Sequence, residues 1–349
     1  MSAPIHDVDA YAAYINRELS WLSFARRVLE LVEDTSLPLL ERVKFAGIMG
    51  MIYDEFVMKR MGGLHQKIKK KPHHIGYDGH TPGEELALCW QELQVQAGIL
   101  DDLIEDVLRP ALAAEAIHIY DYQSLAKTDK KYLQNYFKKS VLPILTPLAV
   151  DAAHPFPFIS NLSFNLAITI INPEGRTRFV RLKVPSNRSR WVALPKEKGF
   201  VPLEQVIAHN LHFLFPKASS FDTNFFRVTR AAKDNPWDRA RLDDHSADEL
   251  PPGSIISMVT AELNYRKFAG IVRLEVSDSI PKELCDWLVD QLRIDHAQVM
   301  PIRGLLGCSD LLGLKIAGKE HLRDQPHHPV PHPRLRKIGP EDHHAFFEE

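Results

Sequence analysis

A glycine-containing segment near the end of the chain has the spacing of a phosphate-binding loop. It reads Gly313-Leu-Lys-Ile-Ala-Gly318-Lys319, and in such a loop backbone N–H groups and a lysine surround the phosphate oxygens. The loop normally continues with a serine or threonine whose hydroxyl holds magnesium. Glu320 occupies that position here, and its carboxylate would repel phosphate. The segment is therefore interpreted as an ordinary turn.

A second short motif, His65-Gln66-Lys67, resembles the HxK start of phospholipase-D-like phosphotransfer sites, where a histidine carries the phosphate covalently. That signature requires an aspartate further along, and the corresponding position here is Pro72. The surrounding residues are basic, which favours a basic surface loop. Because no other residue combines a nucleophile with a credible base, the sequence predicts no catalytic residue in this chain.

Histidines gather at the end of the chain and raise the question of a metal site. They are His327, His328, His332, His343 and His344. Imidazole suits transition metals, but the intervening prolines prevent a helical pair of ligands, and no cysteine or repeated carboxylate completes a set. We therefore predict no metal site.

Positive charge is concentrated in separate islands. These islands comprise Lys59 and Arg60; Lys67, Lys69, Lys70 and Lys71; Lys130, Lys131, Lys138 and Lys139; and Arg176, Arg178, Arg181, Lys183, Arg188 and Arg190. Such islands could form a groove for a polyanion, because binding releases the counterions condensed on it. They could equally be solvated faces balanced by neighbouring acids. Aromatic residues do not alternate with the islands, which disfavours base stacking on single-stranded nucleic acid.

The composition as a whole is that of a globular protein. The chain has 349 residues, 45% of them hydrophobic, and 43 Lys+Arg against 45 Asp+Glu give a net charge of -2. Near-neutrality excludes a globally basic nucleic-acid binder. No apolar run approaches the roughly 18 residues of a membrane helix, and the N-terminus lacks a signal-peptide pattern. The 3 cysteines form no CxxC pair, so we expect a cytoplasmic protein without disulfides.

The elements that must position these residues fall into two predicted domains. Apolar residues at helical spacing predict two helices between residues 14 and 60, the second beginning at Pro38 and ending at Gly62-Gly63. Residues 65–82 are polar and basic and predict a mobile loop. Residues 83–108 form a third predicted helix. Together they indicate a three-helix bundle over residues 1–110.

A mixed head domain is predicted for residues 111–322. Helices are expected at 130–140, 203–214 and 281–292, and strands at 163–171, 178–184, 225–229, 255–259 and 271–276. The first two strands flank a turn, Asn172-Pro-Glu-Gly175, which indicates a hairpin. Residues 233–252 indicate a surface excursion and residues 323–349 a linker rich in proline and histidine. The predicted fold class is α+β, with a mostly antiparallel sheet.

Several longer motifs resemble the bacterial polyphosphate kinase family. Its N-terminal helical domain is resembled by Tyr14-Ile-Asn-Arg-Glu-Leu-Ser-Trp-Leu-Ser-Phe24, Pro38-Leu-Leu-Glu-Arg-Val-Lys-Phe45 and Asp54-Glu-Phe56. The opening of its head domain is resembled by Leu145-Thr-Pro-Leu-Ala-Val-Asp-Ala-Ala-His-Pro-Phe-Pro-Phe158, Asn161-Leu-Ser163, Asn165-Leu166 and Phe226-Arg-Val-Thr-Arg230. The resemblance runs from about Tyr14 to the end of the chain.

This resemblance implies reversible transfer of the terminal phosphate of ATP to polyphosphate, through a phosphohistidine and with magnesium. In the family the catalytic histidines lie in two phospholipase-D-like domains that follow the head domain, and the sequence stops at the linker where they would begin. We therefore expect no activity from this chain alone. The resemblance also implies a helical domain on the adenine side of the nucleotide and a head domain that contributes to dimerisation and to the polyphosphate tunnel.

The resemblance also suggests site residues. The family has Ser-Asn-Leu before Asp-Glu-Phe, and its asparagine contacts ATP; here that position is Ile52, which cannot form a hydrogen bond with a base edge. Asp54, Glu55 and Arg60 match the family pattern. From charge alone, we expect polyphosphate contacts from Lys67, Lys69, Lys70, Lys71, Arg176, Arg178 and Arg181.

Two functions remain open at this point. The chain could be the N-terminal and head portion of a polyphosphate kinase, binding polyphosphate and ATP or ADP, and forming a homodimer or associating with a separate catalytic half. It could instead be a stand-alone, non-catalytic polyphosphate-binding or assembly paralogue that has lost ATP recognition, with no cofactor firmly bound. Neither hypothesis includes nucleic acid or a membrane span.

Overall fold

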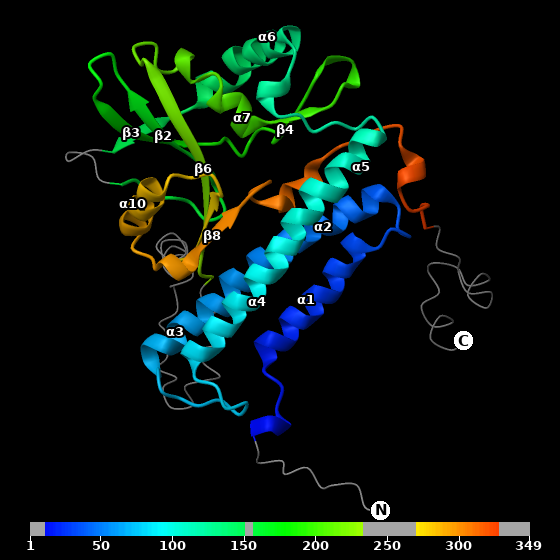
Figure 1. The fold of residues 1–349 in the computed structure, drawn as a ribbon, viewed down its shortest axis with the longest axis vertical. Coiled ribbons are helices and arrows are strands. Elements are labelled where there is room, and N and C mark those ends of the chain that lie inside the picture. Colours follow the sequence, from blue (N-terminus) through cyan, green and yellow to red (C-terminus); the bar gives the residue numbers. More distant parts are fainter. Residues whose placement is uncertain (1–10, 151–155, 233–269, 328–349) are drawn as a thin grey trace, which may run out of the picture.

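The computed structural model describes residues 11–150, 156–232 and 270–327. A helical unit lies below a sheet-containing head in Figure 1, with the blue start of the described chain at the far end of the helical unit. This arrangement confirms the expected α+β class, with a helical N-terminal region and a mixed sheet in the head.

The helical unit consists of three rods, two of which change their helical type along their length. Its α-helices are α1 (Arg17–Glu33), α2 (Leu39–Glu55), α3 (Gly62–Lys70), α4 (Pro82–Asp102) and α5 (Arg109–Ala114). π-helical segments at Phe56–Met61 and Leu103–Leu108 join α2 to α3 and α4 to α5. The Asn16 side chain caps the N-terminus of α1. Its oxygen accepts hydrogen bonds from the N–H groups of Glu18 and Leu19 at 2.9 Å.

The second rod does not end at Gly62-Gly63, as the sequence predicted, but continues to Lys70. A glycine stop requires a left-handed conformation, and neither glycine has a positive φ. Gly62 is instead a packing position, because a Cβ there would lie 2.8 Å from the Cβ of Ala231. The predicted mobile loop over 65–82 is therefore partly wrong, since residues 65–70 are helical. The third rod also passes Pro110 and ends at Ala114.

The head contains a six-stranded sheet in the order β1-β3-β2-β6-β7-β8. Its strands are β1 (Pro147–Val150), β2 (Phe164–Ile171), β3 (Thr177–Lys183), β6 (Ser220–Arg230), β7 (Ile271–Ser277) and β8 (Val299–Ile302). Neighbours are antiparallel except β7 and β8, and a separate two-stranded sheet pairs β4 (Trp191–Ala193) with β5 (Phe200–Pro202). The predicted hairpin is present as β2 and β3. The predicted strand at 255–259 and the excursion at 233–252 lie outside the described residues.

Helices cover both faces of the sheet. Leu166 and Ile168 of β2 pack with α6 (Lys127–Tyr136) and α7 (Leu203–Ala208), whereas Ala167 between them packs with α10 (Lys282–Leu292) on the other face. This is the period-two alternation of a strand buried on both sides. The helix predicted over 203–214 is shorter, because α7 ends at Ala208 and a 3-10 turn follows at Leu211–Phe213.

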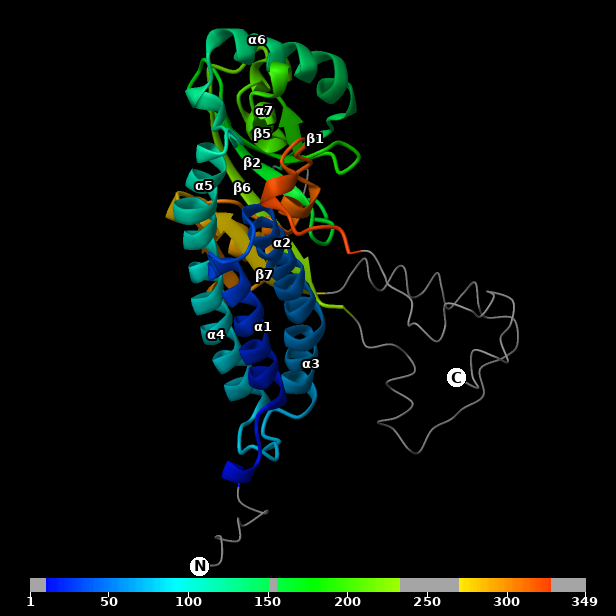
Figure 2. The same ribbon diagram turned by 90° about the vertical axis from the view of Figure 1, so that its right-hand side faces the viewer.

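The helical unit and the head share one hydrophobic core. Leu22, Phe56 and Leu93 of the helical unit cluster with Trp191, Met300 and Leu311 from the other part of the chain. Figure 2 shows the orange-red segment after β8 lying beside α2. The contact is close, since a Cβ on Gly50 would lie 2.4 Å from the backbone nitrogen of Ser309. The two units are therefore joined by packed side chains and backbone.

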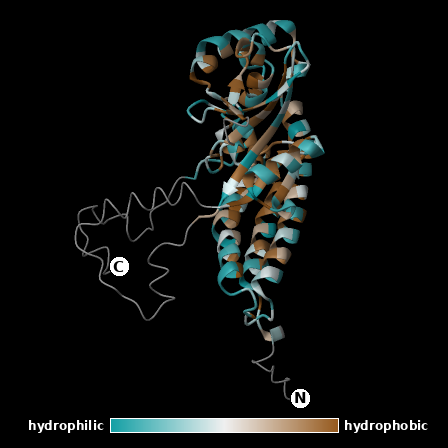
Figure 3. Ribbon diagram, turned by 90° about the vertical axis from the view of Figure 1, so that its left-hand side faces the viewer, coloured by the Kyte–Doolittle hydropathy of each residue, from teal (hydrophilic) through white to brown (hydrophobic). Residues whose placement is uncertain are grey.

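Hydrophobic and hydrophilic residues are interleaved along the rods, as the brown and teal turns in Figure 3 show. Within the described residues no helix has both the length and the apolar composition needed to cross a membrane. The apolar faces of the rods instead supply the shared core.

Candidate functional site

Asp54 lies in a buried cluster of charges between α2 and the sheet. Its carboxylate accepts hydrogen bonds from Arg227 on β6, one of them at 2.9 Å, and from Arg273 on β7. Glu275 on β7 pairs with the same two arginines. The exposed fraction is 6% for Asp54, 4% for Arg227 and 2% for Arg273. The cluster joins three elements by charge-assisted hydrogen bonds.

The arginines set the charge state of this cluster. Burial on its own raises the pKa of Asp54, but attraction to Arg227 and Arg273 outweighs it and holds that pKa below its ordinary value of 3.8. Burial and the nearby Glu275 raise the pKa of the adjacent Cys308 thiol to about 12. Because only a thiolate is an effective nucleophile, Cys308 provides none here.

The other residues expected to contact a nucleotide do not converge with Asp54. Ile52 is half-buried and packs against the shared core. Glu55 is exposed and pairs with Lys59, with Nζ and Oε1 2.5 Å apart. Arg60 faces Glu18, with Nε and Oε2 3.7 Å apart. Asp54 and Glu55 border a groove of about 510 Å3, whose lining includes neither Ile52 nor Arg60.

Sequence reasoning missed the two buried arginines. Arg227 falls inside the Phe226–Arg230 motif, but the resemblance gave it no role, and Arg273 belonged to no motif. A signal was available, since each arginine stands directly between apolar residues of its strand, Arg227 between Phe226 and Val228 and Arg273 between Val272 and Leu274. Arginine is rarely buried without a partner, so such positions indicate a buried acid elsewhere in the fold.

The basic residues expected to contact polyphosphate separate into two groups. Lys69 and Lys70 border a cleft of about 850 Å3 between α3 and the head, while Lys67 and Lys71 are exposed beyond its lining. Arg176 and Arg178 are exposed in and beside the β2–β3 turn. In Figures 1 and 2, α3 lies low in the helical unit and the head sheet lies above it. The two groups therefore lie on different parts of the molecule.

Arg181 differs from the other basic residues of its island, because it is only 5% exposed. Its Nε donates to Oδ1 of Asn165 at 2.9 Å, and burial lowers the pKa of the guanidinium to about 10. The arginine thus belongs to the interior of the sheet. Its position offers no open surface for a polyanion.

Neither short phosphate motif has the structural context that its chemistry requires. A phosphate-binding loop lies between a strand and a helix. The segment from Gly313 to Lys319 instead follows a 3-10 turn and precedes another short 3-10 turn, Glu320–Leu322. His65 lies within α3, and its buried Nε2 has no hydrogen-bond partner among the described residues.

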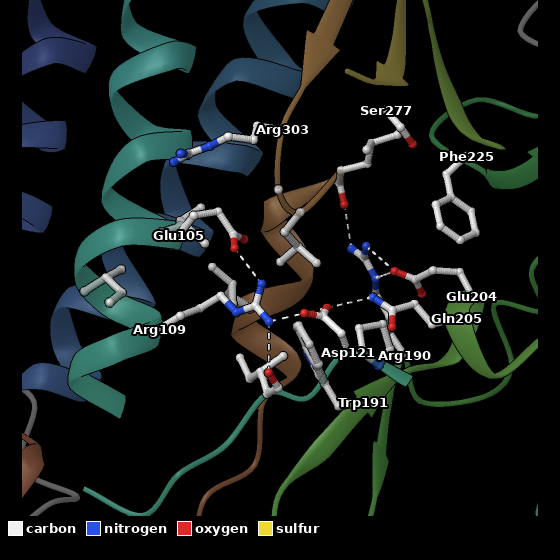
Figure 4. Close-up of a pocket in the computed structure, with 18 of the residues that line it drawn as sticks. Glu105, Arg109, Asp121, Arg190, Trp191, Glu204, Gln205, Phe225, Ser277 and Arg303 are labelled. Carbon is white, nitrogen blue, oxygen red and sulfur yellow. Dashed lines mark hydrogen bonds and ion pairs between the residues drawn. The ribbon is translucent and has the colours of Figure 1, made fainter. Parts of the chain in front are cut away.

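A cavity of about 400 Å3 lies between the end of the third rod and the head. Figure 4 shows side chains that line it. Arg109 pairs with Glu105 at 2.5 Å and Asp121 at 3.5 Å, and Arg190 pairs with Glu204 at 2.6 Å. Apolar side chains, among them Trp191 and Phe225, complete the walls. Because carboxylates neutralise these two guanidinium groups, we assign the cavity to the joint between the two units and not to phosphate binding.

Metal ligands do not assemble in the described part of the chain, where no group of three or more His, Cys, Asp or Glu residues could hold an ion. Of the tail histidines only His327 lies in that part. The Asp54 carboxylate, engaged by two arginines, does not fit the oxygen-rich coordination of magnesium.

Comparison with known proteins decides the family. The family model for the polyphosphate kinase N-terminal domain matches residues 14–120, and that for the polyphosphate kinase middle domain matches residues 128–314. The chain belongs to the polyphosphate kinase family. Both matches lie within the helical and head regions described above.

Individual polyphosphate kinases agree with this assignment. The polyphosphate kinase of Synechocystis is 39% identical over 350 residues, covering 97% of this chain but 47% of the relative. The polyphosphate kinase of Mycobacterium tuberculosis is 36% identical, and the match covers 92% of this chain and 44% of the relative. The crystal structure of polyphosphate kinase from Porphyromonas gingivalis has the same fold, with a TM-score of 0.74 and 21% identity. The superposition covers 94% of this chain and 45% of that structure's chain. The chain thus spans less than half the length of these relatives.

Proposed function

We propose that this chain is the N-terminal and head portion of a polyphosphate kinase, and that it binds and positions polyphosphate while a catalytic half outside it transfers phosphate. The observation that carries the proposal is the match to both domain models in the family's order.

The proposed role depends on position and charge. Phosphoryl transfer needs few covalent steps from a protein, because alignment and neutralisation of phosphate oxygens supply most of the catalysis. Exposed lysine and arginine side chains of this chain would supply part of that neutralisation. The buried cluster around Asp54 would keep the helical unit and the head in a fixed relation, so that both contribute to one complex with polyphosphate, ATP and magnesium.

Assembly is the second part of the proposal. We infer that the chain acts as a homodimer or together with a separate catalytic half. The support is the match of residues 128–314 to the polyphosphate kinase middle domain, the region for which the family resemblance implies a contribution to dimerisation.

A non-catalytic paralogue that binds polyphosphate without ATP is the alternative. Ile52 favours it, because an isoleucine occupies the position where the family resemblance implies a nucleotide-contacting asparagine. Its side chain offers neither a donor nor an acceptor to adenine. Asp54 is also engaged by Arg227 and Arg273, which favours a structural role for it over a nucleotide contact.

Binding measurements on the purified 349-residue chain test the proposal. We expect polyphosphate to bind in calorimetry with an affinity that falls as salt rises, because counterions are released from the polyanion. We expect no ATP-dependent polyphosphate synthesis. ATP binding would favour the kinase portion over the paralogue. Synthesis by this chain alone, or no affinity for polyphosphate at low salt, would contradict the proposal.

A further inference from the structure

A cleft of about 850 Å3 separates α3 from the lower part of the head. One wall is a single face of α3, formed by residues at helical spacing: Gly62, His65, Gln66, Lys69 and Lys70. The opposite wall includes Arg230 at the end of β6 and Arg293 directly after α10. Two elements far apart in the sequence thus present basic side chains to one space.

The charges that line this cleft are not balanced. Lys69, Lys70 and Arg293 make no ion pair among the described residues, and Asp295 is the acid in the lining. The Asp295 carboxylate caps the following 3-10 turn and accepts from the N–H of Gln298. In the cavity of Figure 4, by contrast, carboxylates bind Arg109 and Arg190. Counting only the described side chains, the lining of the cleft therefore carries more positive than negative charge.

His65 adds a neutral polar group to the same space. Burial, followed by the nearby Lys69, lowers the pKa of His65, while Asp295 opposes this shift. The imidazole is therefore uncharged at neutral pH, and one of its nitrogens can donate a hydrogen bond. A neutral donor beside two lysines suits an anion with several oxygen atoms.

The aromatic rings at the cleft have partners of their own. The Arg230 guanidinium lies 4.3 Å from the ring centre of Phe158, and Phe156 contacts Phe179 and Trp287. A nucleotide base would need an open ring face for stacking. Phe158 nevertheless stays 40% exposed, so these rings do not exclude stacking. The preference for a ligand made of repeated phosphates rests instead on the basic side chains of both walls.

We propose that this cleft binds a segment of the polyphosphate chain through Lys69, Lys70 and Arg293. The inference rests on the proposed function, which supplies polyphosphate as the ligand, and it adds the place on the chain where polyphosphate binds. Of the four lysines of this island that were expected to contact polyphosphate, the inference keeps the two that line the cleft and leaves out Lys67 and Lys71, which do not. It adds Arg293 from the opposite wall. Charge-assisted hydrogen bonds from both walls would hold successive phosphates.

Two pairs of lysine substitutions distinguish binding in this cleft from general electrostatic attraction between polyphosphate and the positively charged surface. Lys69→Gln with Lys70→Gln removes two charges that face the cleft. Lys67→Gln with Lys71→Gln removes the same charge from residues that do not line it. All four lysines are exposed, so both pairs should leave folding intact, as the urea midpoint would check.

Polyphosphate affinity would be measured by calorimetry over a salt series. The cleft pair should weaken binding roughly tenfold and reduce the slope of log affinity against log salt by about two. The control pair should change affinity by less than about twofold. Arg293→Asn tests the opposite wall and should weaken binding about threefold. Asparagine suits this position, because Arg293 has a left-handed φ of 54°.

The outcomes distinguish this inference from the proposed function. Equal losses from the two pairs, or unchanged affinity in the cleft pair, would overturn the cleft while leaving polyphosphate binding established. Loss of ATP affinity in the cleft pair with polyphosphate affinity unchanged would assign the cleft to a nucleotide and also overturn the inference. No polyphosphate binding by the unaltered chain would remove the proposed function and the inference together.

Discussion

Asp54 shows how the same residue can satisfy a sequence motif and serve a structural purpose. The motif Asp54-Glu-Phe56 suggested a nucleotide contact, yet the carboxylate is shared by Arg227 and Arg273 in the interior. Removing one member of a buried ion pair leaves the remaining charges unpaired in a medium that solvates them poorly. At the scale of the residue, Asp54 is therefore a link between α2 and the sheet.

Replacing this carboxylate should be costly. We expect Asp54→Asn to lower the free energy of unfolding by about 3–5 kcal/mol, measured by urea denaturation at pH 7. Glu55→Gln is the matched control, because Glu55 is the adjacent acid on the same helix and is exposed. Its effect should be much smaller. Equal effects of the two substitutions would show that the buried cluster does not stabilise the fold.

The pH dependence of this difference follows from the depressed pKa of Asp54. A carboxyl group whose pKa is lower in the folded state contributes stability above its unfolded value, here 3.8, and loses that stability as pH falls through the folded pKa. The difference between the unaltered chain and Asp54→Asn should therefore narrow in acid. A difference that stays constant from pH 7 to pH 3 would contradict the pairing.

At the scale of the element, the rod from α2 to α3 contains two adjacent glycines, Gly62 and Gly63, whose surroundings differ. A Cβ on Gly62 would lie 2.8 Å from the Cβ of Ala231, whereas a Cβ on Gly63 would meet nothing within 4 Å. Both residues are helical. Glycine is a poor helix former, so only the site without a close neighbour can gain from a larger side chain.

These surroundings predict opposite effects from the same substitution. Gly63→Ala should raise the free energy of unfolding by about 0.5–1 kcal/mol, because alanine loses less conformational entropy in a helix. Gly62→Ala should lower it, because the contact with Ala231 must open. Urea denaturation of the two variants gives the comparison. Stabilisation by both would mean that the rod does not pack closely on the head.

At the scale of the whole molecule, the helical unit depends on residues that follow it by 70 positions or more. Its core includes Trp191, Val272, Met300 and Leu311, all from beyond the third rod. These side chains cover apolar surface that the rods would otherwise expose to water. The two units therefore constitute one packed body, although two separate family models match them.

A fragment containing residues 11–120 should consequently be less stable than the full chain. We expect its thermal midpoint, followed by circular dichroism at a helical wavelength, to be lower and its transition to be broader, since it lacks part of its core. A matched experiment on the 349-residue chain should give a single sharper transition. Identical midpoints would show that the shared core contributes little.

The sequence by itself determined the local elements. Apolar periodicity and turn residues placed the β2–β3 hairpin and α10 near their observed bounds and predicted helices in the regions of α1 and α4, because these signals act between near neighbours. Its longer motifs also carried the family resemblance that the comparisons established. The sequence also showed that basic residues occur in islands, but it did not show how these islands are arranged in space.

Only the tertiary structure decided which of these residues act together. Asp54 and Arg227 are separated by 173 positions, so no local pattern could show that they neutralise each other. Gly62 lies inside a helix and packs closely against Ala231, a contact that the local glycine pair could not indicate. Lys69 faces the cleft and Lys67 does not, while Arg181 is buried against Asn165. Burial and charge pairing depend on contacts between distant segments, and these contacts exist only once the chain has folded.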